Sequence, residues 1–551
     1  MPDPRTVADP DRPCHDTDVL VVGAGPTGLL LAAELDLAGA RVMVAEQQPR
    51  RTGQSRALSL QPRSAEILHS RGWLEPLRAH VHAELPAGHF AGIPLDYTVF
   101  DTRFPYQLGI EQARIEEDLE DRLARRGVPV LRGHTFTGLD QDDERVRSTL
   151  DTGTGTGTGA GAGRRGRRRI TSRYVVGADG AHSAVRRHLD VPFPGRDGRI
   201  RMAVADITLT RRPTGVAEGW ALPSFGAGAI GYLLPLRGGV FRLVFAGPEQ
   251  QELDRTADIT PAEVQRALTA AHGPDIEVGT VLWASRFTDA SRQVERYREG
   301  RVLLAGDAAH IHLPAGGQGL NLGLQDAFNL GWKLAAELRG GAPATLLDTY
   351  HAERHPVAER VLVNTRTQGV LTVPDIDVAA VRQVFGELLQ LPEVNRRVAG
   401  EISGLDIRYA IPGGGRHPLL GARVPDLDLG SPASVAGVPS GSVASGTVAS
   451  GTVASGTVAS GTVASGTVAS AAPPAAPTST VYGLLRAGRA VLLDRSDRAG
   501  PSVDGWRDRV SHVRVRGVAG GDADADAMLI RPDGHVCWVA GAGGPELDDA
   551  L

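Results

Sequence analysis

A glycine-rich turn near the amino terminus has the residue types and spacing needed to hold a phosphate-containing ligand. The apolar segment 18–22 is followed by three glycines at the spacing GxGxxG: Gly23, Gly25 and Gly28. The first glycine permits a tight turn, the second lets the backbone approach a pyrophosphate, and the third allows a helix to pack closely on the strand. The amino terminus of that helix offers N–H groups and a partial positive charge to the phosphates. The turn predicts a dinucleotide site, and Glu46 is placed to bind ribose hydroxyls.

The same glycine spacing occurs a second time without the flanking elements. It comprises three residues: Gly161, Gly163 and Gly166. No apolar strand precedes them and no apolar helix follows, so we do not interpret them as a phosphate site. They belong to a Gly/Thr/Ala stretch at 151–163 that continues into arginines at 164–169. We expect a solvated hairpin insertion here in preference to a cationic arm for nucleic acid.

Two later segments each join a buried strand to an acid and a glycine. The first ends in Asp179-Gly180 and the second in Gly306-Asp307. A carboxylate at Asp307 can accept a hydrogen bond from a hydroxyl of a sugar chain. The glycine loop 316–319 then opens an apolar helix, and its backbone N–H groups can stabilise charge that develops on a flavin ring.

The elements around these motifs predict an α/β fold. Residues 17–46 have the pattern strand, helix, strand, which is the βαβ unit of a parallel sheet. Alternating apolar and polar residues within 191–285 predict a mainly antiparallel sheet. Helical character returns over 319–338 and 379–404, and the last part of the chain has the pattern of a small separate α/β domain.

The three motifs in this order resemble the class A flavoprotein aromatic hydroxylases, and the resemblance covers nearly the whole chain. Further matches are Arg56, Gln112, the segment 348–354 and the turn 531–535. The sequence is most similar to the bacterial subgroup with a C-terminal thioredoxin-like domain, which includes anhydrotetracycline hydroxylases, angucycline oxygenases and rifampicin monooxygenases. Phe100-Asp-Thr-Arg-Phe-Pro-Tyr106 resembles the tetracycline-pathway members in particular.

The resemblance implies a Rossmann-like FAD-binding domain with an inserted, mainly antiparallel substrate-binding sheet and a C-terminal thioredoxin-like domain. The expected boundaries are a disordered 1–16, an FAD-binding domain at 17–190 and 286–405, a substrate-binding sheet at 191–285, and a C-terminal domain at 406–551 with a low-complexity insertion at 431–480. The insertion contains a repeat of Ser-Gly-Thr-Val-Ala over 440–469, which has too little apolar bulk to form a core. This chain departs from the family in its two low-complexity insertions and at Leu58-Ser-Leu-Gln61, where relatives carry a glycine-containing turn. It also lacks the redox cysteines of thioredoxins, so we expect the last domain to be structural.

The resemblance implies non-covalent FAD, with NADPH or NADH as a transient co-substrate and O₂ as the oxygen source. Oxygen adds at the flavin C4a position and an OH group passes to an electron-rich ring carbon of an aromatic polyketide. No protein residue is assigned as catalytic, because the flavin carries the chemistry, and Pro314 is expected beside the flavin ring. The residues expected to bind the cofactor are Gly23, Gly25, Pro26, Thr27, Gly28, Glu46, Arg56, Gln112, Asp179, Gly306, Asp307, Pro314, Gly316, Gly319, Leu320 and Asn321.

Composition excludes several other classes of function. A net charge of −5 and an aromatic content of 5% give no reason to expect nucleic acid or an anionic membrane as a partner. Two distant cysteines, Cys14 and Cys537, and no apolar leader or span favour a cytoplasmic protein, which we expect to be a monomer or homodimer. His310 and His312 lack a third ligand at a usual spacing, so no metal is expected. His89 is either a residue of the substrate cavity or an ordinary loop histidine.

Three competing functions stay open at this point. A nicotinamide-dependent dehydrogenase leaves the Asp179-Gly180 and Gly306-Asp307 segments unexplained. A flavin-dependent halogenase carries a WxWxIP segment, and no Trp-x-Trp occurs in this chain. A non-catalytic flavin-binding protein keeps the same cofactor motifs. Within the monooxygenases, the sequence leaves open a step in antibiotic biosynthesis or the oxidation of a rifamycin- or tetracycline-type antibiotic.

Overall fold

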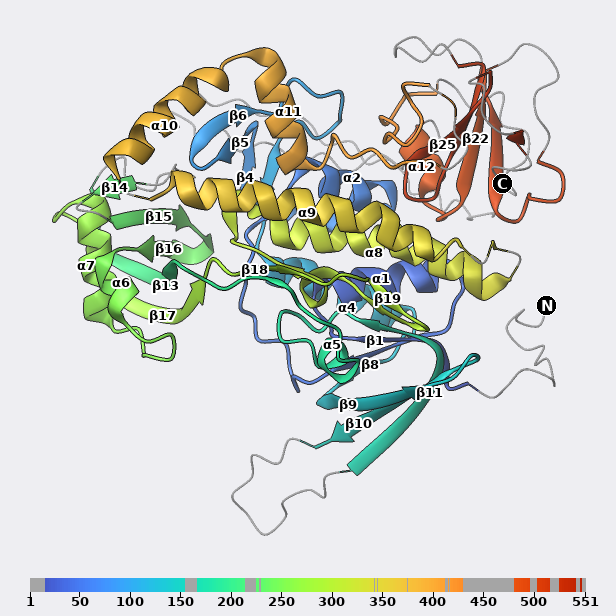
Figure 1. The fold of residues 1–551 in the computed structure, drawn as a ribbon, viewed down its shortest axis with the longest axis horizontal. Helices are drawn as coiled ribbons and strands as arrows, with labels where there is room; N and C mark the ends of the chain where they lie inside the picture. Colours follow the sequence, from blue (N-terminus) through green and yellow to red (C-terminus); the bar gives the residue numbers. More distant parts are fainter. Residues whose placement is uncertain are drawn as a thin grey trace, which may run out of the picture.

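The computed structural model describes most of the chain. The described residues are 15–153, 166–213, 224–226, 229–340, 342–343, 345–373, 375–411, 415, 417–429, 480–495, 503–515, 525–541 and 546–547. Residues 1–14 of the segment 1–16 that was expected to be disordered, the repeat at 440–469 and most of the stretch at 151–163 lie outside these residues. Figure 1 shows a central body with one sheet domain at the left and the C-terminal domain at the upper right.

An eight-stranded sheet forms the centre of the FAD-binding domain. Its strand order is β19-β20-β11-β1-β2-β8, and β10 and β9 extend it from β11. The bounds are β1 Thr17–Val22, β2 Val42–Glu46, β8 Val130–Arg132, β9 His134–Gln141, β10 Val146–Thr152, β11 Gly166–Gly177, β19 Arg298–Glu299 and β20 Val302–Leu304. In the parallel part, Val22 pairs with Gly177, which in turn pairs with Leu304. The three motifs predicted to bind the cofactor therefore leave the sheet at one edge, because parallel strands end together.

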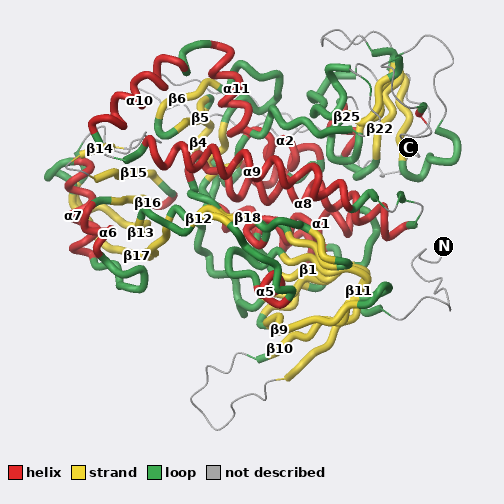
Figure 2. The backbone as a smooth tube through the Cα atoms, viewed as in Figure 1, coloured by secondary structure: helices red, strands yellow, loops and turns green. Residues whose placement is uncertain are grey.

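Helices pack on this sheet and on one another, as the tube of Figure 2 shows. Their bounds are α1 Pro26–Leu37, α2 Pro62–Ser70, α3 Leu74–Arg78, α4 Gln112–Arg125, α5 Ala184–His188, α8 Gln318–Arg339 and α9 Asp348–Leu371, with two 3₁₀ turns, η2 Gly306–Ala308 and η3 Ala315–Gly317. α1 begins with Pro26, whose missing N–H costs nothing at a helix start. A Cβ at Gly331 would lie 2.7 Å from the Glu34 Cβ, so a residue without a side chain lets α8 approach α1.

The predicted antiparallel sheet is confirmed. Five strands pair in the order β14-β15-β16-β13-β17, all antiparallel, and α7 packs against them. The bounds are β13 Arg201–Arg211, β14 Ser224–Gly226, β15 Ala229–Pro235, β16 Val240–Ala246, β17 Glu277–Thr288, α6 Pro248–Glu252, α7 Pro261–His272 and the 3₁₀ turn η1 Arg237–Gly239. Three further small sheets are β3 Ser59–Leu60, β7 Gln107–Gly109 and β4 Ala83–Leu85; β5 Ala87–Phe90 and β6 Ile93–Asp96; and β12 Gly195–Arg196, β18 Ser291–Gln293 and β21 His310–Ile311.

The C-terminal domain contains a four-stranded mixed sheet. Its order is β23-β22-β24-β25; the β22–β23 pair is parallel and the other two pairs are antiparallel. The bounds are α12 Val481–Leu485, β22 Ala490–Asp494, β23 Val510–Arg514, β24 Ala527–Ile530 and β25 Val536–Val539. This agrees with the expected small α/β domain, and its likeness to thioredoxin stays a prediction. Cys537, in β25, is a free cysteine.

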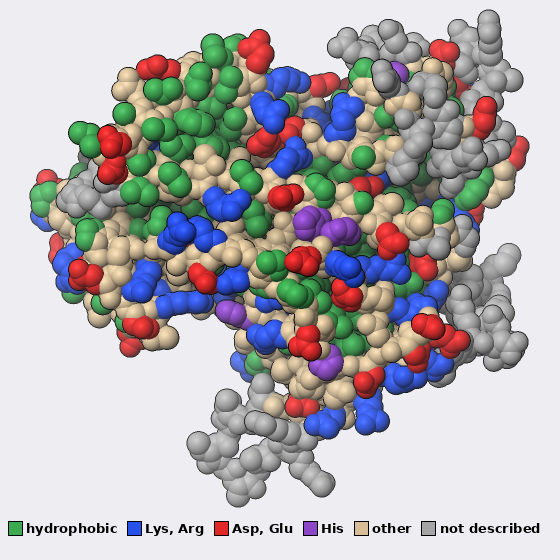
Figure 3. All heavy atoms as spheres, viewed as in Figure 1, with side chains coloured by type: hydrophobic (Ala, Val, Ile, Leu, Met, Phe, Trp, Pro, Cys, Tyr) green, Lys and Arg blue, Asp and Glu red, His purple; other side chains and the backbone are tan. Residues whose placement is uncertain are grey.

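The helical region expected at 379–404 divides into two helices. α10 spans Ile376–Leu388 and α11 spans Pro392–Ser403, since Pro392 begins a new helix and cannot continue the old one. α10 contributes no buried side chain, and Ile376, Val381 and Val384 are 85%, 51% and 53% exposed. Hydrophobic atoms gather on this part of the surface in Figure 3.

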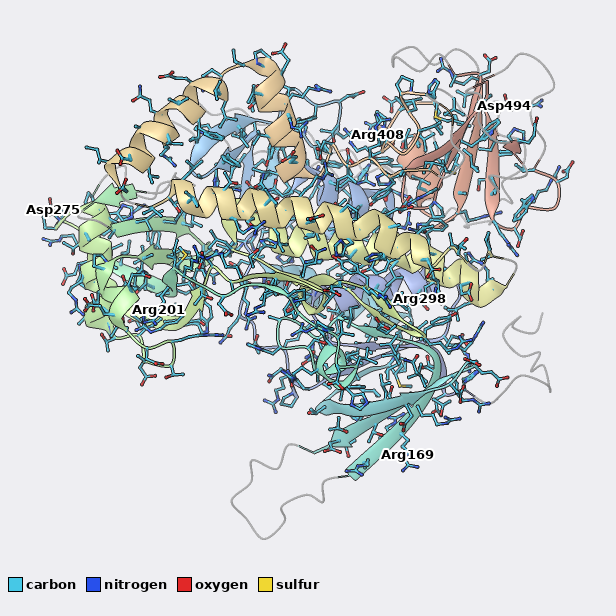
Figure 4. All side chains as sticks on the ribbon, in the orientation of Figure 1. Arg169, Arg201, Asp275, Arg298, Arg408 and Asp494 are labelled. Carbon is cyan, nitrogen blue, oxygen red and sulfur yellow. The ribbon has the colours of Figure 1, made fainter. Side chains whose placement is uncertain are left out.

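The stretch at 151–163 lies between two strands that form a hairpin arm. β10 pairs antiparallel with β11 from Val146 opposite Ser172 to Thr152 opposite Gly166. Arg169 lies on this arm, away from the body, in Figure 4. The flanks of the predicted hairpin are therefore confirmed. Among the described helices, none is both long and apolar enough to cross a membrane.

Candidate active site

The first glycine turn connects β1 to α1 in the predicted manner. Gly23 has a φ of +108°, and a Cβ there would lie 2.3 Å from the Ala178 carbonyl oxygen. A Cβ at Gly28 would lie 2.1 Å from the Gly23 oxygen, so both positions require glycine for packing within the protein. A Cβ at Gly25 would meet no atom within 4 Å. Space for a ligand therefore lies at Gly25, the position predicted to face the pyrophosphate.

Glu46 lies beside this turn at the end of β2. Its carboxylate accepts hydrogen bonds from the N–H groups of Ala24 and Gln48, both at 2.8 Å. These bonds fix the carboxylate next to the glycine turn. The contact with ribose stays a prediction.

Thr27 lies where α1 meets the Gly306 turn and α8. A Cβ at Gly306 would lie 2.8 Å from the Thr27 hydroxyl oxygen, and one at Gly323 would lie 2.3 Å from it. The side chain of Thr27 thus packs the first motif against the third. Pro26 precedes it as the first residue of α1.

Asp179 uses its carboxylate to cap α5. It accepts hydrogen bonds from the Ser183 hydroxyl at 2.5 Å and from the Ala184 N–H at 2.6 Å. Burial raises the pKa of this carboxyl, while the hydrogen bonds oppose the rise. Arg186, on the same helix, donates to the carbonyl oxygens of Ala181 and Ala308, each at 2.8 Å, and so ties the second motif to the third. A cofactor contact by Asp179 stays a prediction.

The third motif presents Asp307 outward. Gly306 has a φ of +60°, and η2 begins at this residue. Asp307 is exposed, and its carboxylate makes no hydrogen bond or ion pair to the residues that the structure describes. An acceptor held on a rigid turn without a protein partner is what a hydroxyl of the ribityl chain requires.

The glycine loop before α8 is held by buried amides. Gly316 and Gly317 have φ values of +69° and +63°, and Gly317 precedes the first residue of α8. Asn321 donates to the Gly317 oxygen at 2.7 Å and accepts from the Gln61 N–H at 2.8 Å. Gln61 itself donates to the Gly316 oxygen at 2.8 Å. The side chain of Asn321 therefore shapes the loop, and so does Gln61, which sequence reasoning noted only as a departure from relatives.

The remaining residues that were expected to bind the cofactor lie around this loop and near the start of α4. Pro314 is exposed, Leu320 is half-buried, and a Cβ at Gly319 would meet only the His312 ring, at 3.7 Å. Gln112 begins α4, and its side-chain oxygen accepts from the Ala57 N–H at 3.1 Å. The side chain of Arg56, next to Ala57, is exposed. The structure brings these residues near the predicted path of FAD but leaves their contacts with it as predictions.

Two helix amino termini are available to an anionic ligand. Neither α1, after Gly25, nor α8, after Gly317, has a side chain that caps its first N–H groups, whereas α5 is capped by Ser183 and Asp179. Uncapped N–H groups and the helix dipole favour negative charge at such termini. Open space at Gly25, two uncapped termini and an unpartnered Asp307 fit a molecule with a pyrophosphate, a polyol chain and an electron-accepting ring. The residues present therefore fit FAD.

The histidines of the third motif bind other protein groups. The His310 Nε2 lies 2.7 Å from the Asp326 carboxylate, and the His312 Nδ1 lies 2.8 Å from the Leu313 oxygen. No group of three potential ligands occurs among the described residues. His89 lies with its ring centroid 6.2 Å from that of Tyr232 on β15, and burial lowers its pKa to about 4. It is therefore neutral at physiological pH.

Sequence reasoning missed three residues that build this site. Asp326 and Gln61 are buried polar residues, and Arg186 had no assigned role. Asp326 offered one signal, since an acid stands between apolar residues of the helix at 318–339. Its partners are distant in the sequence, so the signal alone could not show what it binds.

Comparison with known proteins identifies the family. The family described as FAD binding domain matches residues 16–365, and the family described as aromatic-ring hydroxylase, C-terminal, matches residues 462–551. The chain is 41% identical to 12-dehydrotetracycline 5-monooxygenase/anhydrotetracycline 6-monooxygenase of Streptomyces rimosus, covering 97% of this chain and 98% of the relative. It is 40% identical to rifampicin monooxygenase of Streptomyces venezuelae, covering 95% of each. The crystal structure of CabE, an aromatic hydroxylase from angucycline biosynthesis, matches with a TM-score of 0.79 at 37% identity, covering 97% of this chain and 98% of that chain.

The matches extend over both the cofactor-binding body and the C-terminal domain, and the site geometry suits the same cofactor. The chain belongs to the FAD-dependent aromatic-ring hydroxylases and is a flavin monooxygenase that uses NAD(P)H and O₂.

Proposed function

We propose that this monooxygenase hydroxylates a polycyclic aromatic polyketide as a step of antibiotic biosynthesis. The observation that carries the proposal is the near full-length similarity, at 41% identity, to two monooxygenases named for anhydrotetracycline, in a chain whose α1 and α8 termini are uncapped and whose Asp307 is exposed. The angucycline hydroxylase of similar fold supports the same substrate class.

The roles of the protein groups follow from their positions. The amino terminus of α1 would bind the pyrophosphate, and Asp307 would bind the polyol chain. The N–H groups of 316–319 would lie at the ring, where they can stabilise negative charge. When bound, FAD would accept electrons from NAD(P)H and activate O₂. The antiparallel sheet would hold the substrate against the ring and exclude water, which otherwise favours release of hydrogen peroxide.

Three titratable groups of the site, Asp179, His310 and His89, are already engaged in hydrogen bonds within the protein. Asp179 caps a helix, His310 bonds to Asp326, and His89 is neutral with its Nδ1 accepting from the Gly92 N–H at 3.2 Å. The neutral His89 ring then carries its proton on Nε2. It can donate a hydrogen bond to a substrate oxygen, and it is not placed to remove a proton through that atom.

The test is a screen of aromatic polyketides, with anhydrotetracycline and rifampicin included, for substrate-stimulated NAD(P)H oxidation and a product heavier by one oxygen. Stimulation by a tetracycline or angucycline precursor supports the proposal. Stimulation by rifampicin alone favours the second candidate, oxidation of a rifamycin-type antibiotic, to which the 40% identity with rifampicin monooxygenase points. Bound flavin without any stimulated turnover across the panel would contradict the proposed substrate class.

The proposal also includes the cellular compartment and the oligomeric state of the protein. We place the reaction in the cytosol, where NAD(P)H is available, and expect the active form to be a monomer or homodimer. Size measurement by light scattering of the FAD-loaded protein checks the second point. FAD should be released by acid precipitation; Cys537, whose pKa burial raises to about 12, lies in the C-terminal sheet and does not suit a covalent link.

A further inference from the structure

Asp326 is a fully buried carboxylate that holds the turn carrying Asp307. One of its oxygens accepts from the Gly306 N–H at 3.1 Å and from the His310 ring at 2.7 Å. The other accepts from the Arg354 guanidinium at 2.8 Å. Asp326 lies on α8, Arg354 on α9, and Gly306 on the turn after β20. These bonds join three elements at one point directly behind the flavin-facing turn.

Arg354 connects this carboxylate to the C-terminal part of the chain. Its guanidinium donates to the Tyr409 hydroxyl at 3.1 Å and to the Leu322 oxygen at 3.4 Å. Arg354 and Asp326 are both 0% exposed, so neither charge has water as an alternative partner. A buried ion pair of this kind holds its geometry firmly, because breaking it leaves a charge uncompensated.

Tyr409 is in turn held by the turn 531–535 of the C-terminal domain. Its ring lies 4.3 Å from the His535 ring, and the Arg531 guanidinium lies 5.2 Å from its centroid. Arg531 also donates to both Glu353 oxygens, at 2.7 and 2.9 Å, one residue before Arg354. The turn therefore contacts the residue pair that positions Asp326.

We propose that Asp326 is a positioning residue for the flavin-binding turn, and that the C-terminal domain sets the position of this turn through Tyr409 and Arg354. The chain of contacts runs from His535 through Tyr409, Arg354 and Asp326 to the Gly306 amide. A role for the C-terminal domain in holding FAD follows, although none of its described residues lies at the cofactor motifs.

The test measures the dissociation constant of FAD by flavin fluorescence and the visible spectrum of the bound flavin, in the full-length protein. Asp326→Asn should weaken FAD binding about tenfold or more, as the loss of a charge-assisted bond implies. Tyr409→Phe removes one hydroxyl far from the cofactor and should weaken FAD binding roughly threefold to tenfold, with a shifted flavin spectrum. In the double variant the two effects should be less than additive, because both act through Arg354.

Tyr482→Phe is the matched control. The Tyr482 hydroxyl is also buried and donates to the Val424 oxygen at 2.9 Å, but among the described residues no hydrogen bond links this hydroxyl to Arg354 or Asp326. It should lower the melting temperature about as much as Tyr409→Phe and leave FAD affinity within about twofold. Equal FAD affinities of Tyr409→Phe and Tyr482→Phe would overturn the proposal, whether both are unchanged or both are weakened. If Asp326→Asn does not fold, the comparison of FAD affinity between the two tyrosine variants still tests the proposal.

Discussion

The cofactor edge of the sheet and the junction with the C-terminal domain differ in how far their polar groups are paired. At the cofactor edge, Asp307 has no partner among the described residues and the first N–H groups of α1 and α8 are uncapped. At the junction, Glu353 accepts from Arg531, Lys333 and Asn329 at 2.7–2.9 Å. Unpaired groups on rigid elements bind a ligand, and paired groups fix the elements that carry them.

The junction between the FAD-binding domain and the C-terminal domain contains buried charged groups. The Arg71 guanidinium of the FAD-binding domain donates to the carbonyl oxygens of Leu485 and Pro532, and Arg63 donates to that of Asp533. All three acceptors belong to the C-terminal domain, and both arginines are buried. The two domains therefore share charged groups that water cannot replace.

The largest effect is expected at the cofactor edge, from Gly25→Val. A Cβ at this position meets no protein atom within 4 Å, so the variant should fold, but the valine side chain would occupy the space predicted for the pyrophosphate and abolish FAD binding. Flavin content and the melting temperature of the apoprotein measure the two expectations. Gly386→Val, at another position with open space around the Cβ, is the control and should retain flavin. A Gly25→Val protein that purifies yellow would remove this turn from the cofactor site.

At the junction, Arg531→Ala should lower the free energy of unfolding by about 3–5 kcal/mol, because it removes the buried guanidinium that pairs with both Glu353 and Asp533 and leaves Lys333 as the remaining cation beside Glu353. Urea unfolding measures the change. Arg507→Ala removes an arginine from an exposed pair with Asp504 and should cost less than about 1 kcal/mol. Similar losses for the two variants would contradict the contrast between the junction and the surface.

The junction should also make stability depend on acidity. Arg531 lowers the pKa of Glu353 to about 2 against the opposing effect of burial, from an ordinary value of 4.5. Between these values the unfolded chain binds more protons than the folded protein, so stability falls as the pH falls, by up to about 1.4 kcal/mol per unit. Urea unfolding at several pH values should show this slope in the wild type. A Glu353→Gln variant with the same slope from pH 4.5 downward would assign it to other groups.

Asp307→Ala tests the unpaired acceptor. It should weaken FAD binding by roughly 1.5–3 kcal/mol if one charge-assisted hydrogen bond is lost. A small displacement of the ring should also lower coupling, so that NAD(P)H oxidation at saturating FAD yields more hydrogen peroxide and less product. The melting temperature of the apoprotein should change little, since the carboxylate holds no described protein group. Lower stability with unchanged FAD affinity and coupling would make Asp307 a turn residue only.

The smallest effect is expected from deleting 440–469. The repeat cannot bury a core, and the cost of closing a longer loop changes by only about 0.6 kcal/mol per doubling of length. Flavin content, turnover and melting temperature should match those of the full chain. An insoluble or flavin-free deletion variant would show that the repeat contributes to packing.

The sequence by itself determined the local part of the cofactor site. Gly23, Gly316 and Gly317 have positive φ values, which favour glycine through sterics within a residue or two, so the glycine spacing predicted both the turns and the dinucleotide ligand. The order of the motifs predicted the family, and the periodicity within 191–285 predicted the antiparallel sheet. These inferences hold because backbone sterics and strand alternation are properties of short segments.

Only the tertiary structure decided which buried polar groups meet. Gln61 reaches the Gly316 oxygen across 255 residues, and Arg531 reaches Glu353 across 178. A charged residue in the sequence does not show which residue it pairs with, because the energy of a buried ion pair depends on positions that the whole fold determines.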